Sequence, residues 1–159
     1  MEHRAALGLG SNLGDRRGHL RRALALLGEA PGVRVAAVSR FLETEPEGGP
    51  PGQRRYLNAC CVIRTALPPR ELLALALEIE RRCGRIRGAK WGPRTLDVDI
   101  LFYDQLVLEE PGLVIPHPRL AGRAFVLEPL AEVAPDWLHP ALGLTVRQLR
   151  ERLRGGEAG

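Results

Sequence analysis

The first part of the chain alternates between short apolar runs and one amphipathic segment. Residues 5–9 are apolar or glycine throughout, and a run of this length predicts a buried strand. Over residues 16–28, apolar side chains recur every three or four positions, which predicts a helix with one apolar face. The Pro-Gly pair at 31–32 ends this helix, and the loosely alternating residues 33–42 predict a second strand.

The order of elements then continues with strand, helix and strand. Residues 56–63 predict the third strand, and prolines at 68–69 open a second helix that Gly84 ends. The apolar run at 98–102 predicts the fourth strand. This order is that of the ferredoxin-like β-α-β-β-α-β core, so we predict an α+β fold with an antiparallel sheet.

Further elements follow this core. A turn and a short strand are predicted over residues 103–108, and additional C-terminal helices over 124–134 and from Thr145 onward. Residues 155–159 are predicted to form a frayed tail. The whole chain, 1–159, is long enough to form a single domain with a sizeable core.

Composition narrows the class of protein. The sequence is 45% hydrophobic and 26% charged, which is ordinary for a globular protein, and no apolar run approaches the ~20 residues of a membrane span. The N-terminus lacks the pattern of a secretory signal. Cys60, Cys61 and Cys83 do not form a spaced framework, so we expect reduced thiols and a cytoplasmic location, with no membrane partner.

The charge balance points to an anionic partner. Twenty-three basic against nineteen acidic side chains give a net charge of +4. Nucleic acid and a nucleotide both fit this charge. Aromatic residues are scarce and no basic-aromatic RNA-recognition motif is present, so we expect a nucleotide and no nucleic acid.

The candidate chemistry centres on residues 90–103, where a loop leads into the fourth strand. Asp97 and Asp99 lie two residues apart at its mouth, and in a strand such side chains point to the same face. Mg²⁺ prefers a few carboxylates together with waters and phosphate oxygens, and this pair could bridge two ions. Taken alone, the pair could equally be two solvated acids bonded to arginine. Arg85, Arg87 and Arg94 precede it, and the combination favours a polyphosphate site.

A second candidate site lies on the predicted strand over residues 56–63. Tyr56 and Asn58 share one face of a strand, where an aromatic ring and an amide suit a planar heterocycle, although such a pair is often ordinary strand sequence. The long polar segment 43–55 before them is either functional or a tolerated surface insertion. The turn at 10–15 lacks a complete phosphate-binding motif, and we interpret it as turn geometry and helix capping.

The segment from Trp91 to Leu101, WGPRTLDVDIL, resembles the signature of the 6-hydroxymethyl-7,8-dihydropterin pyrophosphokinases, a family of folate biosynthesis. The Gly-Ser-Asn turn at 10–12 and the Pro-His pair at 116–117 resemble further parts of the family, so that the resemblance covers most of the chain. It implies the ferredoxin-like architecture, with the site along one side of the sheet. It also implies a Mg²⁺-dependent diphosphokinase that moves a pyrophosphoryl group from ATP to the pterin and leaves AMP.

The resemblance assigns roles residue by residue. As catalytic residues it implies Arg85, Arg94, Asp97 and Asp99, of which the two aspartates would hold two Mg²⁺ ions. As ATP-binding residues it implies Glu80, Arg85, Arg87, Trp91, Arg94, Ile100, His117 and Arg123. As pterin-binding residues it implies Thr44, Pro46, Tyr56, Asn58, Trp91, Asp97 and Phe125.

Two other functions stay open on the residues alone. One is a different metal-dependent phosphoryl or nucleotidyl enzyme that shares the Asp-x-Asp pair and binds no pterin. The other is a non-catalytic nucleic-acid-binding domain, whose affinity would depend steeply on salt. The length of the signature favours the pyrophosphokinase, acting as a monomer on ATP and 6-hydroxymethyl-7,8-dihydropterin.

Overall fold

A five-stranded antiparallel sheet organises the computed structural model, which describes residues 2–45, 52, 54–84 and 95–158, with the backbone alone for 157 and 158. Its strands are β1 (His3–Ser11), β2 (Val33–Val38), β3 (Leu42–Thr44), β4 (Tyr56–Thr65) and β5 (Asp97–Tyr103). The strand order is β2-β4-β1-β5, and β3 also pairs with β4. All these pairings are antiparallel, as predicted for the ferredoxin-like core.

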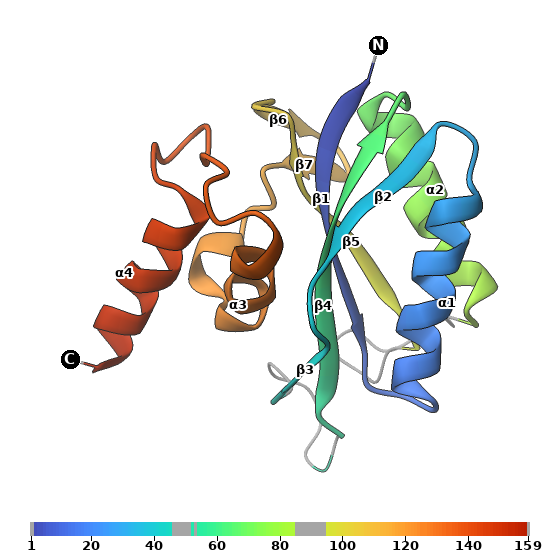
Figure 1. Cartoon of the computed structure of the whole chain (residues 1–159), viewed down its shortest axis with the longest axis horizontal. Helices are drawn as coiled ribbons and strands as arrows, with labels where there is room; N and C mark the ends of the chain where they lie inside the picture. Colours follow the sequence, from blue (N-terminus) through green and yellow to red (C-terminus); the bar gives the residue numbers. More distant parts are fainter. Residues whose placement is uncertain (1, 46–51, 53, 85–94, 159) are drawn as a thin grey trace.

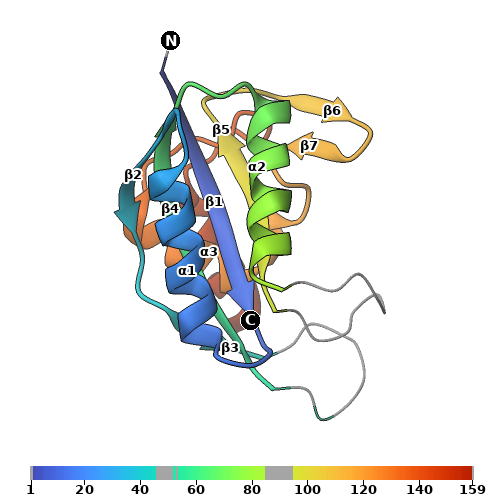
Figure 2. The same ribbon diagram turned by 90° about the vertical axis from the view of Figure 1, so that its right-hand side faces the viewer.

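Helices cover both faces of this sheet (Figure 1). The first pair consists of α1 (Arg16–Glu29) and α2 (Pro69–Arg82), which lie side by side on one face (Figure 2). On the other face lies α3 (Ala124–Val133), preceded by the short helix η1 (Leu120–Gly122), and α4 (Val146–Ala158) packs against α3. A small hairpin of β6 (Leu108–Glu110) and β7 (Leu113–Ile115) lies beside β5.

Alternation along the strands divides the apolar side chains between two cores. In β4, the side chains that pack with α1 and α2 are Leu57, Ala59, Cys61 and Ile63, whereas Cys60 and Val62 pack with α3 and α4.

The adjacent cysteines Cys60 and Cys61 therefore face opposite layers, as predicted, and the three cysteines are free and buried. Burial raises the pKa of Cys61 to about 12, so this thiol stays protonated and unreactive at neutral pH.

Capping chemistry fixes where the first two helices begin. The Asp15 carboxylate accepts a hydrogen bond of 3.0 Å from the backbone N–H of Gly18, which confirms the predicted capping role of this turn. Helix α2 begins with Pro69, whose missing N–H costs nothing in the first turn. Gly84 follows its end in a left-handed conformation, with φ of 83°.

Three predicted boundaries were wrong. The strand expected over 33–42 is divided into β2 and β3. The Ser39 N–H still bonds to the Cys60 carbonyl at 2.9 Å, but the Cys60 N–H bonds to the Ser39 hydroxyl at 2.9 Å and not to a backbone carbonyl. The turn and short strand expected over 103–108 are partly confirmed: residues 104–105 form a turn, but the strand, β6, begins only at Leu108 and pairs with β7. The tail expected to fray from residue 155 continues α4 to Ala158.

Arginines lie in register at one end of the sheet. Arg64 is paired with Arg4 on one side and with Arg34 on the other. The Arg4 guanidinium lies 3.8 Å from the centroid of the Trp137 ring, which keeps this charge against an aromatic face. Asp97 pairs with Gly10 at the opposite end of β1, so part of the positive charge lies away from the aspartates.

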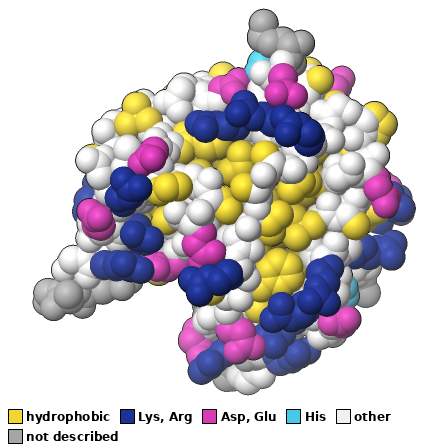
Figure 3. Space-filling view, viewed as in Figure 1, with side chains coloured by type: hydrophobic (Ala, Val, Ile, Leu, Met, Phe, Trp, Pro, Cys, Tyr) yellow, Lys and Arg dark blue, Asp and Glu magenta, His cyan; other side chains and the backbone are white. Residues whose placement is uncertain are grey.

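Apolar and basic side chains gather on one face of the molecule (Figure 3). Figure 3 shows apolar side chains gathered between the sheet and the α3–α4 layer, bordered by Arg side chains. Across the described ranges, we found no helix long and apolar enough to cross a membrane.

Candidate active site

Asp97 and Asp99 begin β5 and project from the sheet face that α3 covers. Val98 and Ile100 between and after them pack on the opposite face, with α1 and α2. The prediction that the two aspartates share a face is therefore confirmed. Asp97 is half-buried and Asp99 is exposed, so both carboxylates remain accessible to a ligand from solvent.

Each aspartate lies opposite a glycine of β1. Gly10 pairs with Asp97 and Gly8 pairs with Asp99. A methyl group on Gly10 would lie 2.8 Å from Oδ1 of Asn58, closer than real side chains allow. Gly8 and Gly10 add no side chains of their own to the sheet beside the carboxylates, and we call this stretch of β1 the glycine surface. We did not predict this role, although two glycines spaced by two in a strand signal a close approach.

The Asn58 amide occupies the space that Gly10 leaves. Its Oδ1 lies over β1, and its Nδ2 donates a hydrogen bond to Oγ1 of Thr44 on β3. Asn58 is only 7% exposed, so this hydrogen bond is shielded from water. Tyr56 lies two residues before it on the same strand and pairs with Thr44. The structure thus brings Tyr56, Asn58 and Thr44 together, and they form a polar, partly aromatic wall beside the glycine surface.

Phe125 enters the region from the first turn of α3. The neighbouring Val126 carbonyl lies 3.7 Å from Sγ of Cys60, which is two residues from Asn58 on the same face of β4. This contact places the start of α3 over the part of the sheet that carries Asn58 and Tyr56. The Arg123 guanidinium lies 5.2 Å from the Phe125 ring centroid, so a cation and an aromatic ring are presented together.

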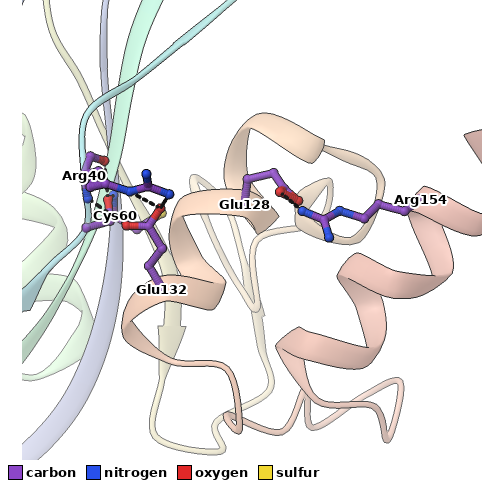
Figure 4. Close-up of polar contacts among 6 residues, drawn as sticks. Arg40, Cys60, Glu128, Glu132 and Arg154 are labelled. Atoms are coloured by element: carbon purple, nitrogen blue, oxygen red, sulfur yellow. Dashed lines mark hydrogen bonds and ion pairs between the residues drawn. The ribbon is translucent and has the colours of Figure 1, made fainter.

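Ion pairs hold α3 in this position from both sides (Figure 4). The Glu132 carboxylate accepts hydrogen bonds from the Arg40 side chain at 3.1 and 3.2 Å and from its backbone N–H at 2.9 Å. Glu128, one turn earlier, pairs with Arg154 of α4. The helix that carries Phe125 is therefore tied to both the sheet and the C-terminal helix.

His117 lies along the outer side of β5. Its backbone N–H donates to the Leu101 carbonyl at 3.0 Å. Its ring Nδ1 accepts the backbone N–H of Arg119 at 3.2 Å, so the proton of the neutral ring is on Nε2. Burial, together with nearby Arg123 and Arg119, lowers the His117 pKa from 6.5 to about 4. At neutral pH this ring is therefore an uncharged hydrogen-bond donor.

Glu80 and Ile100 differ from the other proposed ATP-binding residues in orientation. The Glu80 side chain is 5% exposed, and its Oε2 accepts the backbone N–H of Val98 at 2.8 Å. The Ile100 side chain packs in the core with α1 and α2, on the face opposite the aspartates. Only the backbone of Ile100 is thus available to a ligand on the α3 face.

The turn after β1 connects segments on both sides of residues 46–53. The Asn12 amide donates to the Arg54 carbonyl at 3.3 Å. Arg16 donates to the Arg55 carbonyl at 2.9 Å and to the Glu43 carboxylate at 2.8 Å. The hydrogen bond from Arg16 lowers the pKa of Glu43. Besides its capping role, the turn therefore links the end of β3 to the start of β4, a role that the sequence did not reveal.

Some proposed site residues lie outside the described residues. They are Pro46, Arg85, Arg87, Trp91 and Arg94. Within the described ranges, no group of three or more His, Cys, Asp or Glu side chains is placed to hold a metal ion. Asp97 and Asp99 thus offer two carboxylates, and waters and substrate oxygens would have to supply the other ligands, as is common for Mg²⁺.

Comparison with known proteins bears on the family and the fold. Residues 6–135 match the model of the 7,8-dihydro-6-hydroxymethylpterin-pyrophosphokinase family. Three relatives are named 2-amino-4-hydroxy-6-hydroxymethyldihydropteridine pyrophosphokinase. The one from Synechocystis sp. is 46% identical over 95% of this chain and 76% of its own length. Those from Bacillus subtilis and Methylorubrum extorquens are 47% and 45% identical, over 84% and 94% of this chain and 79% and 93% of their own lengths.

Solved structures share the fold. One is the Plasmodium falciparum HPPK-DHPS with pteroate, which superposes with a TM-score of 0.77 at 15% identity. The match covers 96% of this chain but 44% of that one, so the chain spans less than half of that protein. The family match and the identities over most of each relative decide the assignment: the chain belongs to the 7,8-dihydro-6-hydroxymethylpterin-pyrophosphokinase family.

Proposed function

We propose that this chain transfers a pyrophosphoryl group from ATP to 6-hydroxymethyl-7,8-dihydropterin on the sheet face that carries Asp97, Asp99 and Asn58. In this reaction the hydroxymethyl oxygen forms a bond to the β-phosphorus of ATP. The bond between that phosphorus and the oxygen bridging it to the α-phosphorus breaks, so that AMP leaves and the hydroxyl proton is released. The observation that supports the proposal best is the glycine surface at Gly8 and Gly10, which joins the carboxylates to the Asn58 amide.

Asp97 and Asp99 would hold two Mg²⁺ ions at the start of β5. The ions would neutralise the phosphates and orient them for transfer. Both carboxylates point to one face, and the glycines opposite add no side chains of their own there. Because the strand fixes the two side chains, little reorganisation is needed when the ions and ATP bind.

The pterin would bind against the glycine surface, next to the Asn58 amide. An amide offers one acceptor and two donors, which suit the alternating donors and acceptors on a pterin edge. Tyr56 and Phe125 would stack on the ring from β4 and α3. Thr44 orients Asn58 by accepting its Nδ2 hydrogen, which leaves Oδ1 on the side of β1.

Positive and neutral donors would bind the phosphates. We propose His117 Nε2–H and the Arg123 guanidinium for this role, from the segment beside β5. Arg85, Arg87, Arg94 and Trp91 keep the roles that the family signature implies, with Arg85 and Arg94 stabilising the charge on the transferred group. We further propose that residues 1–159 act as one monomeric, cytoplasmic domain that needs neither nucleic acid nor a membrane.

Gly10→Ala should weaken pterin binding while the fold is kept. The added methyl would lie 2.8 Å from Oδ1 of Asn58, and the amide can turn away because it is the end of a side chain. One or two misdirected hydrogen bonds predict a rise in the KM for the pterin of about 10-fold or more, with the KM for ATP nearly unchanged. Steady-state kinetics with each substrate varied in turn measures both values.

Gly8→Ala is the matched control for this change. Its methyl would meet Leu101 at 3.5 Å, an ordinary contact, and would not touch Asn58. An equal rise in pterin KM for both variants would contradict the role of Gly10 in orienting the amide.

His117→Gln should preserve ATP binding better than His117→Asn. Glutamine can place an N–H near the position of Nε2, whereas asparagine can keep only the acceptor that binds the Arg119 N–H. Loss of one hydrogen bond to phosphate predicts about 10-fold weaker ATP binding in the asparagine variant, measured by calorimetry. Equal affinities in the two variants would argue against a donor role for Nε2.

The same histidine has a pH signature. Its pKa of about 4 in the folded chain lies below 6.5, so the unfolded chain binds more protons between these values. Neutral His117 therefore supports stability above pH 6.5, and this contribution is lost as pH falls towards 4. An NMR titration of the ring in the free protein should give a midpoint near 4, and a midpoint near 6.5 would contradict the buried placement.

Product analysis tests the function itself. The protein is incubated with ATP, Mg²⁺ and 6-hydroxymethyl-7,8-dihydropterin, and the nucleotide products are separated. Pterin-dependent AMP, with a pterin diphosphate, is the expected result. ADP, or AMP formation that does not depend on the pterin, would favour a different phosphoryl or nucleotidyl enzyme.

A further inference from the structure

Glu80 occupies a position that is unfavourable for a carboxylate. Its side chain is 5% exposed, and burial of a charged group costs free energy unless partners compensate for it. It also lies in the last turn of α2, where the helix dipole favours cations, and its neighbours Arg81 and Arg82 follow that preference. A buried carboxylate at this position therefore needs a specific reason.

The reason is the position of β5 at the edge of the described sheet. Among the described residues, the strand order β2-β4-β1-β5 gives β5 a strand partner on one side, that of β1. Backbone groups of an edge strand that point outward have no ladder partner. Val98 has such an N–H, and Oε2 of Glu80 accepts it at 2.8 Å. The carboxylate takes the place that a neighbouring strand would occupy.

Val98 is the residue between the two aspartates. Its side chain packs in the core with α1 and α2, while those of Asp97 and Asp99 project from the opposite face. Fixing the Val98 N–H to α2 therefore fixes the peptide units from which both carboxylates project. Farther along the same edge, the backbone N–H of His117 binds the Leu101 carbonyl at 3.0 Å, so the outer side of β5 is held on either side of Asp99.

We propose that Glu80 is a positioning residue: its carboxylate, presented by α2, holds the β5 edge in the geometry that lets Asp97 and Asp99 bind divalent cations together. This assigns it a role different from direct contact with ATP. The role in cation binding rests on the proposed function, whereas the role in fixing the strand edge stands on the hydrogen bond alone.

Three substitutions separate the hydrogen bond from charge and packing. Glu80→Gln keeps an acceptor oxygen and removes the charge. Glu80→Asp keeps the charge but retracts the carboxylate by one methylene, out of reach of Val98. Glu80→Met keeps the volume and removes the acceptor. Glu78→Gln is the control, because Glu78 lies on the same helix and pairs with Arg81 at the surface.

The test measures hydrogen exchange of the Val98 amide by NMR in the metal-free protein, and Mn²⁺ binding by electron paramagnetic resonance in the presence of a non-hydrolysable ATP analogue. We expect Glu80→Asp and Glu80→Met to speed exchange at Val98 at least 10-fold and to weaken Mn²⁺ binding about 10-fold. Glu80→Gln and Glu78→Gln should stay within about 3-fold of the original protein in both measurements.

The outcomes distinguish the claims. Unchanged exchange at Val98 in Glu80→Asp, or fast exchange in Glu80→Gln, would overturn the proposal, and these two variants suffice if Glu80→Met does not fold. Faster exchange with unchanged Mn²⁺ affinity would restrict Glu80 to a structural role and would also overturn it. If the original protein binds neither Mn²⁺ nor the ATP analogue, the proposed function fails, while the exchange result still decides the edge contact.

Discussion

Asp97→Asn should lower kcat for pyrophosphoryl transfer by about 1000-fold or more, a loss of roughly 4 kcal/mol of transition-state stabilisation. Asparagine has nearly the same shape but carries no charge, so it would bind Mg²⁺ poorly and leave phosphate charge uncompensated. The side chain is half-buried and lies opposite Gly10, so the substitution creates no steric conflict. Initial rates of AMP formation under saturating ATP and pterin measure the effect.

Asp136→Asn is the matched control for this prediction. Asp136 is an exposed aspartate that pairs with Arg147 at 3.1 Å, in the segment between α3 and α4. We expect its kcat to stay within about 2-fold, because an exposed ion pair contributes little to stability and lies outside the proposed site. Near-normal turnover in a folded Asp97→Asn protein would exclude Asp97 as a required metal ligand.

Asn58→Ala should raise the KM for the pterin by about 100-fold and leave the KM for ATP within a few-fold. The variant removes an amide that is 7% exposed and aligned between Thr44 and Gly10. Two lost hydrogen bonds to the pterin edge, each worth about 1–1.5 kcal/mol, account for this factor. Varying each substrate while the other is saturating separates the two KM values.

Thr44→Val provides a graded comparison. It removes only the oxygen that accepts the Asn58 Nδ2 hydrogen and keeps the size of the side chain. The amide stays in place with a less fixed orientation, so we expect a rise of about 10-fold or less. If Asn58→Ala raised the KM for ATP as much as that for the pterin, the assignment of this wall to the pterin would be wrong.

The elements of the fold were predictable where one face of an element is buried. The spacing of apolar residues in α1 and α2 follows their contact with the sheet, and the alternation in β4 follows its position between two layers. The antiparallel ferredoxin-like order followed from the order of these elements.

The boundaries that were wrong depend on tertiary contacts. The break between β2 and β3 reflects the Ser39 hydroxyl bonding to Cys60, a contact across strands that a local pattern does not encode. The β6–β7 hairpin forms from two strands of three residues each, too short for a period to be recognised. The glycines at 155–156 predicted fraying, yet α4 continues past them.

The pair of carboxylates at the site could be predicted from the sequence spacing, whereas the shape of the site could not. The spacing of two positions between Asp97 and Asp99 predicted that their side chains share a face of the strand. The role of Gly10 depends on strand register, since only the pairing of β1 with β4 and β5 places it between Asn58 and Asp97. The low pKa of His117 likewise depends mainly on burial of its ring, which the sequence around it does not reveal, and on the nearby Arg123 and Arg119.

The most direct test of the account is a crystal structure of the protein with Mg²⁺, the pterin and an ATP analogue that has a methylene group between the α- and β-phosphorus atoms. The account predicts metal ions on Asp97 and Asp99, the β-phosphorus facing the hydroxymethyl oxygen, and the pterin ring against Gly10 with its edge on the Asn58 amide. A pterin bound elsewhere, or metal ions that do not touch these aspartates, would contradict it.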